Sequence, residues 1–180
     1  MTKIAEVRFD VSALVEAYRW VATRAEPGVA QRGQDELRSI SLTHRPEAVE
    51  PFYDGNQSQF DENGNKVYHE AEFSIFNSYF RDTYFHDIYQ QAPFQIGRMR
   101  LMVLPPLTIY RMHVDATKRT HLAIITNPDS RLTLRSGETF HVPADGFLYT
   151  VNTKRMHTAY NSGLQERVHL TMSMADTEDQ

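Results

Sequence analysis

The sequence predicts a mainly β protein, a double-sheet jelly roll with helices ahead of it near the N-terminus. From residue 95 onward, eight short runs rich in β-branched and aromatic residues follow one another, separated by Pro, Gly, Asn and Asp. Eight short strands with such turns indicate a two-sheet sandwich or barrel. The runs are QIGRMRLMVL, LTIYRMHV, RTHLAIIT, RLTLR, TFHV, FLYTVNT, MHTAY and ERVHLTMSM.

Length and composition fit one domain. A chain of 180 residues with 41% apolar residues buries a sizeable core and leaves little room for a second domain. We therefore expect a single domain over 1–180. Its parts are a helical support region over 1–95, the β core over 96–174 and an acidic tail over 175–180.

The first 95 residues carry fewer signals. Residues 11–25 have an apolar stripe with helical spacing, Asp10 is a suitable N-cap, and Pro27-Gly28 ends the helix. A short strand is expected around Ser39–Thr43, and Asn63-Gly64 marks a hairpin or loop tip.

The segment 73–89 is dense in aromatic residues. Phe73, Phe76, Phe80 and Tyr84 recur every three or four residues, which indicates that part of the segment is helical. A helix packed against a sheet explains this stripe. An aromatic wall of a substrate pocket is the alternative.

Charge and cysteine content exclude several classes. The net charge of −4 argues against a nucleic-acid partner, which normally selects a basic surface. The absence of cysteine excludes disulfides, thiolate catalysis and cysteine-zinc sites. No signal-peptide pattern and no run of 18 apolar residues is present, so a soluble, cytoplasmic protein without a membrane partner is expected.

His113-Val114-Asp115 is the most informative local feature. In a strand, residues two apart project from the same face, so this imidazole and carboxylate can converge on one ion. They are two of the three ligands of a 2-His-1-carboxylate triad, which leaves open positions on iron(II). Alone, an H-x-D tripeptide also arises by chance.

Two later residues strengthen the metal hypothesis. His157 follows Asp115 by 42 residues on the seventh run, and Arg167 lies ten residues further on the eighth. If these strands are antiparallel around residues 161–163, positions 157 and 167 have similar heights. An arginine there can form a bidentate ion pair with a carboxylate beside the metal.

The alternation in the eighth run leaves two interpretations open. Arg167, His169, Thr171 and Ser173 share one face, and apolar residues occupy the other. A barrel with a polar interior under an apolar outer layer gives this pattern, and so does a half-exposed strand.

Other basic residues are weaker candidates. Arg119 and His121 share a strand face and could help to hold an acidic cosubstrate. Arg98, Arg100 and Arg111 could bind a substrate carboxylate, although a structural or solvated arginine is the more common case. The remaining candidates, interpreted as structural or surface histidines, are His44, His69, His86 and His141.

These residues together resemble the iron(II)- and 2-oxoglutarate-dependent oxygenases. About 77 residues from Arg98 to Met174 look like the aspartyl/asparaginyl β-hydroxylase branch, which includes bacterial free-proline hydroxylases. The matching text is Leu104-Pro105, Arg119-Thr120-His121-Leu122, Pro143-Ala144-Asp145-Gly146 and HTAYNSGLQERVHL from His157.

The resemblance implies a cupin-like double-stranded β-helix with iron(II) held by His113, Asp115 and His157. It implies that Arg167 binds the distal carboxylate of 2-oxoglutarate, with Arg119 and His121 as auxiliary contacts. The animal aspartyl hydroxylases of this branch lack the carboxylate ligand, whereas Asp115 is present here. That difference favours the small-molecule hydroxylases.

The function expected is hydroxylation of an amino acid or an amino-acid residue, with O2 consumed and succinate and CO2 released. One alternative is a cupin-type metalloenzyme that does not use 2-oxoglutarate. Another is a non-catalytic β-sandwich binding module. The sequence leaves the substrate, the position hydroxylated and the oligomeric state open.

Overall fold

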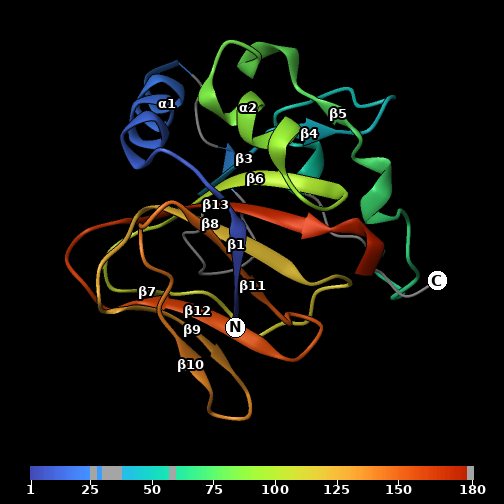
Figure 1. Ribbon diagram of the computed structural model, residues 1–180. Coiled ribbons are helices and arrows are strands. Elements are labelled where there is room, and N and C mark those ends of the chain that lie inside the picture. Colours follow the sequence, from blue (N-terminus) through green and yellow to red (C-terminus); the bar gives the residue numbers. More distant parts are fainter. Residues whose placement is uncertain (25–27, 30–37, 57–59, 178–180) are drawn as a thin grey trace.

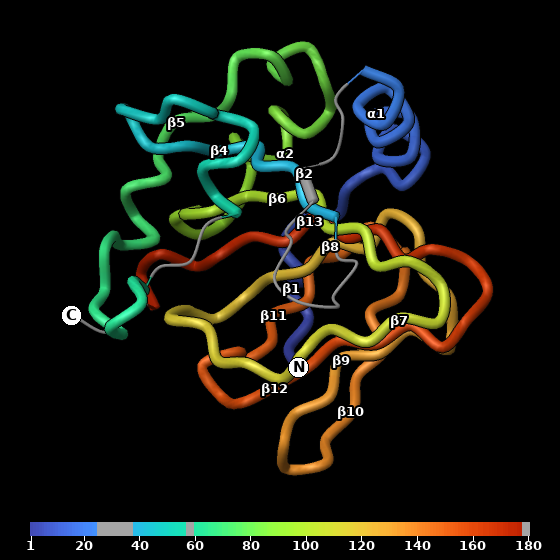
Figure 2. Tube along the Cα trace, turned by 180° about the vertical axis from the view of Figure 1, so that it is seen from behind, coloured from blue at the N-terminus to red at the C-terminus, as the bar shows by residue number. Residues whose placement is uncertain are grey.

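The computed structural model describes residues 1–24, 28–29, 38–56 and 60–177. Figure 1 shows two β layers, with the helices packed on the outer side of the larger one. Within these ranges, the larger sheet has seven strands in the order β1-β11-β8-β13-β6-β3-β2, and the smaller has four in the order β10-β9-β12-β7. Figure 2 shows the same layering from behind, with β4 and β5 beside the helices.

All strand pairs are antiparallel. The large sheet contains β1 (Thr2–Arg8), β11 (Phe147–Val151), β8 (Arg119–Ile125), β13 (Arg167–Met174), β6 (Ile96–Leu104), β3 (Arg38–Ser41) and β2 (Gly28–Val29). The small sheet contains β10 (Thr139–Phe140), β9 (Ser130–Leu134), β12 (His157–Asn161) and β7 (Thr108–Ile109). A separate two-stranded sheet consists of β4 (Thr43–His44) and β5 (Ile75–Phe76).

The predicted jelly roll is confirmed. Each of the eight runs contains a strand, β6 to β13, and consecutive runs alternate largely between the two sheets. The second run is shorter than predicted, because after β7 only His113 pairs again, as an isolated bridge to His157. This break leaves the His113–Asp115 segment as a loop held against β12.

The alternation along β13 separates two cores. Val168, Leu170 and Met172 lie in the apolar cluster between the large sheet and the helices. Arg167 and His169 are buried on the opposite face, toward the small sheet. The polar-interior interpretation of this strand is therefore correct, and the half-exposed interpretation is wrong.

Helix α1 (Val11–Arg24) confirms the predicted N-terminal helix. The carboxylate Oδ1 of Asp10 accepts hydrogen bonds from the backbone N–H groups of Ser12 at 2.7 Å and Ala13 at 3.1 Å, as an N-cap does. Leu14 and Val21 are fully buried against the large sheet. Pro27, expected to end the helix, lies outside the described residues.

The aromatic segment is helical only at its end. Helix α2 covers Tyr84–Gln91, whereas Phe76 lies in β5 and Phe80 in the 3-10 turn η3 (Ser78–Phe80). Phe73, Phe76 and Phe80 are nevertheless buried, the last two in the same core as α1. These aromatic residues therefore pack in the layer that covers the large sheet, although they belong to different elements. Other single-turn 3-10 elements are η1 (Asp54–Asn56), η2 (Glu70–Glu72) and η4 (Ala175–Thr177).

The N-terminal region contributes more than the predicted helices. It adds β1 to one edge of the large sheet and β2 and β3 to the other. Next to β1, Phe9 donates its N–H to the carbonyl of Gly146 at 2.8 Å. Gly146 has φ +82°, and a Cβ there would collide with the carbonyl of Phe9, so this turn requires glycine. Among the described residues, no helix is long and apolar enough to cross a membrane.

Candidate metal centre

Backbone hydrogen bonds fix the His113–Asp115 segment between the two sheets. His113 and His157 exchange two N–H···O=C bonds of 2.9 Å each, and Asp115 donates its N–H to the carbonyl of Thr153 at 3.0 Å. The two imidazole centroids consequently lie 4.2 Å apart. The two histidines are neighbours because the chain pairs them directly, which spacing in the sequence does not reveal.

Both imidazoles have the same orientation. The Nδ1 of His113 lies 2.9 Å from the carbonyl oxygen of Arg111, and the Nδ1 of His157 lies 3.0 Å from that of Arg155. A carbonyl oxygen only accepts, so each Nδ1 carries the proton. Each Nε2 therefore presents a lone pair, the arrangement that fixes the tautomer of metal-binding histidines.

The three predicted ligands surround one point. The Nε2 of His113 is 3.9 Å from Asp115 Oδ1, and the Nε2 of His157 is 3.6 Å from Asp115 Oδ2. The ligand atoms of all three residues lie within 4.8 Å of one another. Two neutral imidazoles and one carboxylate are the donor set of the iron(II) facial triad, so the residues fit that metal.

Asp115 is ionised at neutral pH. Burial by itself would raise the pKa of this carboxyl, but Arg119 and the two histidines lower it to about 2. Burial lowers the pKa of His157, so that ring is neutral. Metal binding requires deprotonated ligands, and Asp115 and His157 meet that condition at neutral pH.

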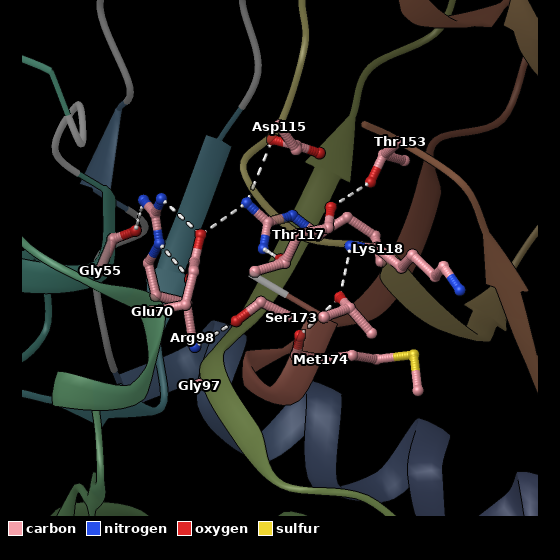
Figure 3. Close-up of polar contacts among 12 residues, drawn as sticks. Gly55, Glu70, Gly97, Arg98, Asp115, Thr117, Lys118, Thr153, Ser173 and Met174 are labelled. Atoms are coloured by element: carbon pink, nitrogen blue, oxygen red, sulfur yellow. Dashed lines mark hydrogen bonds and ion pairs between the residues drawn. The ribbon is translucent and has the colours of Figure 1, made fainter. Parts of the chain in front are cut away.

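A buried chain of ion pairs holds the Asp115 carboxylate in place. Arg119 donates from Nη2 to Asp115 Oδ1 at 3.1 Å and to Glu70 Oε1 at 2.9 Å. Glu70 also binds Arg98, which donates to both carboxylate oxygens at 2.9 and 3.0 Å (Figure 3), so Glu70 bridges the two arginines. Glu70 is fully buried, and its pKa is well below the usual value because the two arginines outweigh the effect of burial. We call Arg98, Glu70, Arg119 and Asp115 the ion network.

A glycine lets the N-terminal region reach this network. A Cβ on Gly97 of β6 would stand 2.5 Å from the backbone oxygen of Glu70 and 2.6 Å from Ser173 Oγ. Both distances are far below van der Waals contact. Gly97 thus allows η2 to approach the sheet closely enough for Glu70 to reach both arginines.

The interior beyond the metal centre contains basic groups without partners. Arg167 is 3% exposed, and its Nε and Nη1 have no hydrogen-bond partner among the described residues. Burial lowers the pKa of Arg167 to about 10, so it remains charged. His121 Nε2 and both ring nitrogens of His169 also lack partners in the part of the chain that the structure describes. Burial lowers the pKa of both rings, to about 3 for His121. An unpaired buried charge is costly, so this interior is suited to an anion.

The structure brings most of the predicted site residues together. His113, Asp115 and His157 form one cluster, Arg119 contacts it directly, and His121 lies on the same strand as Arg119. Arg98 is occupied by Glu70, and Arg111 is exposed.

Two buried residues, Glu70 and His169, were absent from the predicted site. Glu70 gave no sequence signal, because it stands alone in a polar stretch. His169 shares a strand face with Arg167, and that alternation could have identified it.

A jelly roll that carries two histidines and one carboxylate between its sheets belongs to the class of non-haem metalloproteins. Residues 83–177, just over half of the chain, match the model of the Aspartyl/Asparaginyl beta-hydroxylase family. The chain belongs to this family, and it is by class a 2-oxoglutarate-dependent hydroxylase.

Two solved structures have similar folds. A 2OG-Fe(II) oxygenase family oxidoreductase from Burkholderia pseudomallei has 16% identity and a TM-score of 0.52 over 94% of this chain and 81% of its own. A Pseudomonas putida prolyl-4-hydroxylase has 19% identity and a TM-score of 0.52 over 92% of this chain and 85% of its own. A search of the curated proteins found no match.

Proposed function

We propose that this protein binds iron(II) through His113, Asp115 and His157, binds 2-oxoglutarate beside them, and hydroxylates an amino acid or an amino-acid residue. When bound, iron(II) and 2-oxoglutarate supply the oxidising chemistry: one atom of O2 enters the substrate as a hydroxyl group, the other enters succinate, and CO2 is released. The chain itself supplies ligands, charge and a site shielded from water.

The observation that carries the cosubstrate assignment is Arg167. Its guanidinium is buried between the sheets, it stays charged, and no described residue forms a hydrogen bond with its Nε or Nη1. A rigid guanidinium fork matches a carboxylate with two parallel hydrogen bonds. The distal carboxylate of 2-oxoglutarate satisfies this group, so we assign that contact to Arg167.

Two further residues have roles on the metal side of the cosubstrate. His121, with Nε2 unpartnered and the ring neutral, is suited to donate or accept one hydrogen bond to a bound carboxylate or keto group. Arg119 reaches Asp115, and its Nε has no partner within the described ranges. We assign both as auxiliary contacts, with Arg119 also orienting the Asp115 carboxylate.

The competing enzyme class is a cupin-type metalloenzyme that does not use 2-oxoglutarate. Such an enzyme has no need for a buried, unpaired arginine deep between the sheets. Membership in the hydroxylase family also favours the 2-oxoglutarate assignment. A purely structural binding module is disfavoured by the orientation of both histidine Nε2 atoms toward one carboxylate.

The direct test is succinate release from 2-oxoglutarate across a panel of free amino acids and short peptides. We expect at least one compound to stimulate succinate release with equal formation of a hydroxylated product. His157→Ala should abolish both the reaction and tight metal binding. His86→Ala, on α2 outside the metal centre, should retain both. Succinate release that persists in His157→Ala would contradict the metal assignment.

A further inference from the structure

Thr153 contacts the segment that carries Asp115 at two points. It lies between β11 and β12 and is only 1% exposed. Its backbone carbonyl accepts the N–H of Asp115 at 3.0 Å, and its Oγ1 donates to the carbonyl of Thr117 at 2.8 Å (Figure 3). One residue therefore holds the chain at Asp115 itself and again two residues beyond it.

The second contact continues to the Asp115 carboxylate. Thr117 is fully buried, and its Oγ1 accepts a hydrogen bond of 2.7 Å from Nη1 of Arg119. Nη2 of the same guanidinium donates to Asp115 Oδ1 at 3.1 Å. Because a guanidinium is planar and rigid, an acceptor bound at Nη1 helps to set the direction in which Nη2 points. We call the path from Thr153 through Thr117 and Arg119 to Asp115 the threonine relay.

Asp115 depends on this support more than the two histidines do. His113 and His157 are paired by their own backbone groups, and each Nδ1 is bonded to a carbonyl two residues earlier. Asp115 lies outside the strands, and its backbone N–H is bonded to Thr153. The ion network contacts only its side chain, so Thr153 is the residue that fixes the backbone from which the carboxylate projects.

We propose that Thr153 is a positioning residue that sets where the Asp115 carboxylate lies relative to the two histidines. The inference rests on the proposed function, since it assumes that these three residues bind the metal. With Oδ1 bonded to Arg119, the relay leaves Oδ2, which lies 3.6 Å from His157 Nε2, to face the metal. Loss of the Thr153 hydroxyl should therefore weaken and distort the metal site while both histidines stay paired.

Cobalt(II) binding to the metal-free protein tests this role without turnover. Thr153→Val keeps the shape of the side chain and removes Oγ1. We expect it to bind cobalt(II) about tenfold more weakly than the wild type. At saturation its cobalt(II) absorption spectrum should differ from that of the wild type, because the carboxylate meets the metal in another geometry. Thr153→Ser restores the hydroxyl and should return the affinity to within about twofold of the wild type.

Thr83→Val is the matched control. Thr83 precedes α2, is 8% exposed, and donates from Oγ1 to the carbonyl of Phe80 at 2.7 Å. Each valine variant loses one buried hydroxyl-to-carbonyl hydrogen bond, so both should melt roughly 2–6 °C below the wild type. Only Thr153→Val should lose cobalt(II) affinity and change the spectrum, since Thr83 is not part of the threonine relay.

Several results would overturn the inference. Unchanged cobalt(II) affinity in Thr153→Val is one, and binding by Thr153→Ser that is as weak as in the valine variant is another. Weaker binding with an unchanged spectrum at saturation, or an equal loss of affinity in Thr83→Val, would assign Thr153 a merely structural role and would also overturn it.

A second variant decides the question if Thr153→Val does not fold. Thr117→Val removes the acceptor of Arg119 Nη1 and should bind cobalt(II) at least about threefold more weakly, with an altered spectrum; wild-type affinity and spectrum in it would overturn the inference. If the wild type binds no cobalt(II), or His157→Ala binds it as tightly as the wild type, the proposed function itself is refuted. The two failures are therefore distinguishable.

Discussion

Replacing Glu70 with Gln tests whether the ion network supports the metal centre. The substitution keeps the shape of the side chain and removes its charge. Glu70 accepts three guanidinium hydrogen bonds of 2.9 to 3.0 Å from Arg98 and Arg119, and it is fully buried. In Glu70→Gln, two buried arginines share a neutral partner whose amide N–H groups point toward donors.

The hydrogen bonds that remain in Glu70→Gln determine how much unfolding free energy is lost. Removing one partner of a buried ion pair costs about 3–5 kcal/mol. Arg98 keeps its bond to the carbonyl of Gly55 and Arg119 keeps Thr117 and Asp115, so we expect the lower end, about 3 kcal/mol. For a domain of this size, that loss corresponds to a decrease in Tm of roughly 6–12 °C. Because Arg119 also orients Asp115, metal affinity should fall about tenfold.

Two assays measure these effects. Urea unfolding with a thermal melt gives the free energy of unfolding, and cobalt(II) titration of the ligand-free protein gives the metal affinity. Glu62→Gln, on the exposed loop near Gly64, is the matched control and should change stability by less than about 0.5 kcal/mol. The reasoning is refuted if Glu70→Gln melts within 2 °C of the wild type and binds cobalt(II) with equal affinity.

Further predictions concern separate parts of the molecule. Arg167→Ala should weaken 2-oxoglutarate binding by at least about tenfold while metal affinity changes by less than about threefold, measured by calorimetry; equal losses would contradict its role as a carboxylate partner. Asp10→Ala removes the N-cap of α1 and should cost about 1 kcal/mol of unfolding free energy in urea, and an unchanged midpoint would count against the cap. Burial raises the pKa of Asp54, but the hydrogen bonds and charge of Arg45 lower it further, so the net pKa is below the usual value. The ion pair of Asp54 with Arg45 therefore contributes its full stability above about pH 4, and this contribution declines as the pH falls further. Asp54→Asn should flatten that acid limb of the stability curve, and an identical limb would show that the pair contributes nothing.

The β core could be predicted because its residues carry local signals. Each run from β6 to β13 is rich in β-forming residues and is bounded by turn residues. These local signals predict the strands without knowledge of any tertiary contact. Strand β1 has no such signal. Most of its residues are exposed, and it exists because it pairs as the edge strand with β11, a contact between distant parts of the chain.

The candidate metal ligands could be predicted from the sequence, whereas the residues that hold Asp115 in place could not. His113 and Asp115 are close in sequence, and His157 could be found by its relation to Arg167. The support of Asp115 depends on Glu70, which lies 45 residues earlier and reaches the centre only because β6 offers Gly97. Spacing along one strand cannot reveal a partner that arrives from a different layer.

The most direct test of the account is anaerobic addition of 2-oxoglutarate to the iron(II)-loaded protein, followed by absorption spectroscopy. A visible metal-to-ligand charge-transfer band with one equivalent of 2-oxoglutarate per chain is the expected result. The same addition to His157→Ala should give no band, since one of the three ligands is missing. A wild-type protein that holds iron(II) but develops no band would contradict the 2-oxoglutarate assignment and favour a cupin-type enzyme.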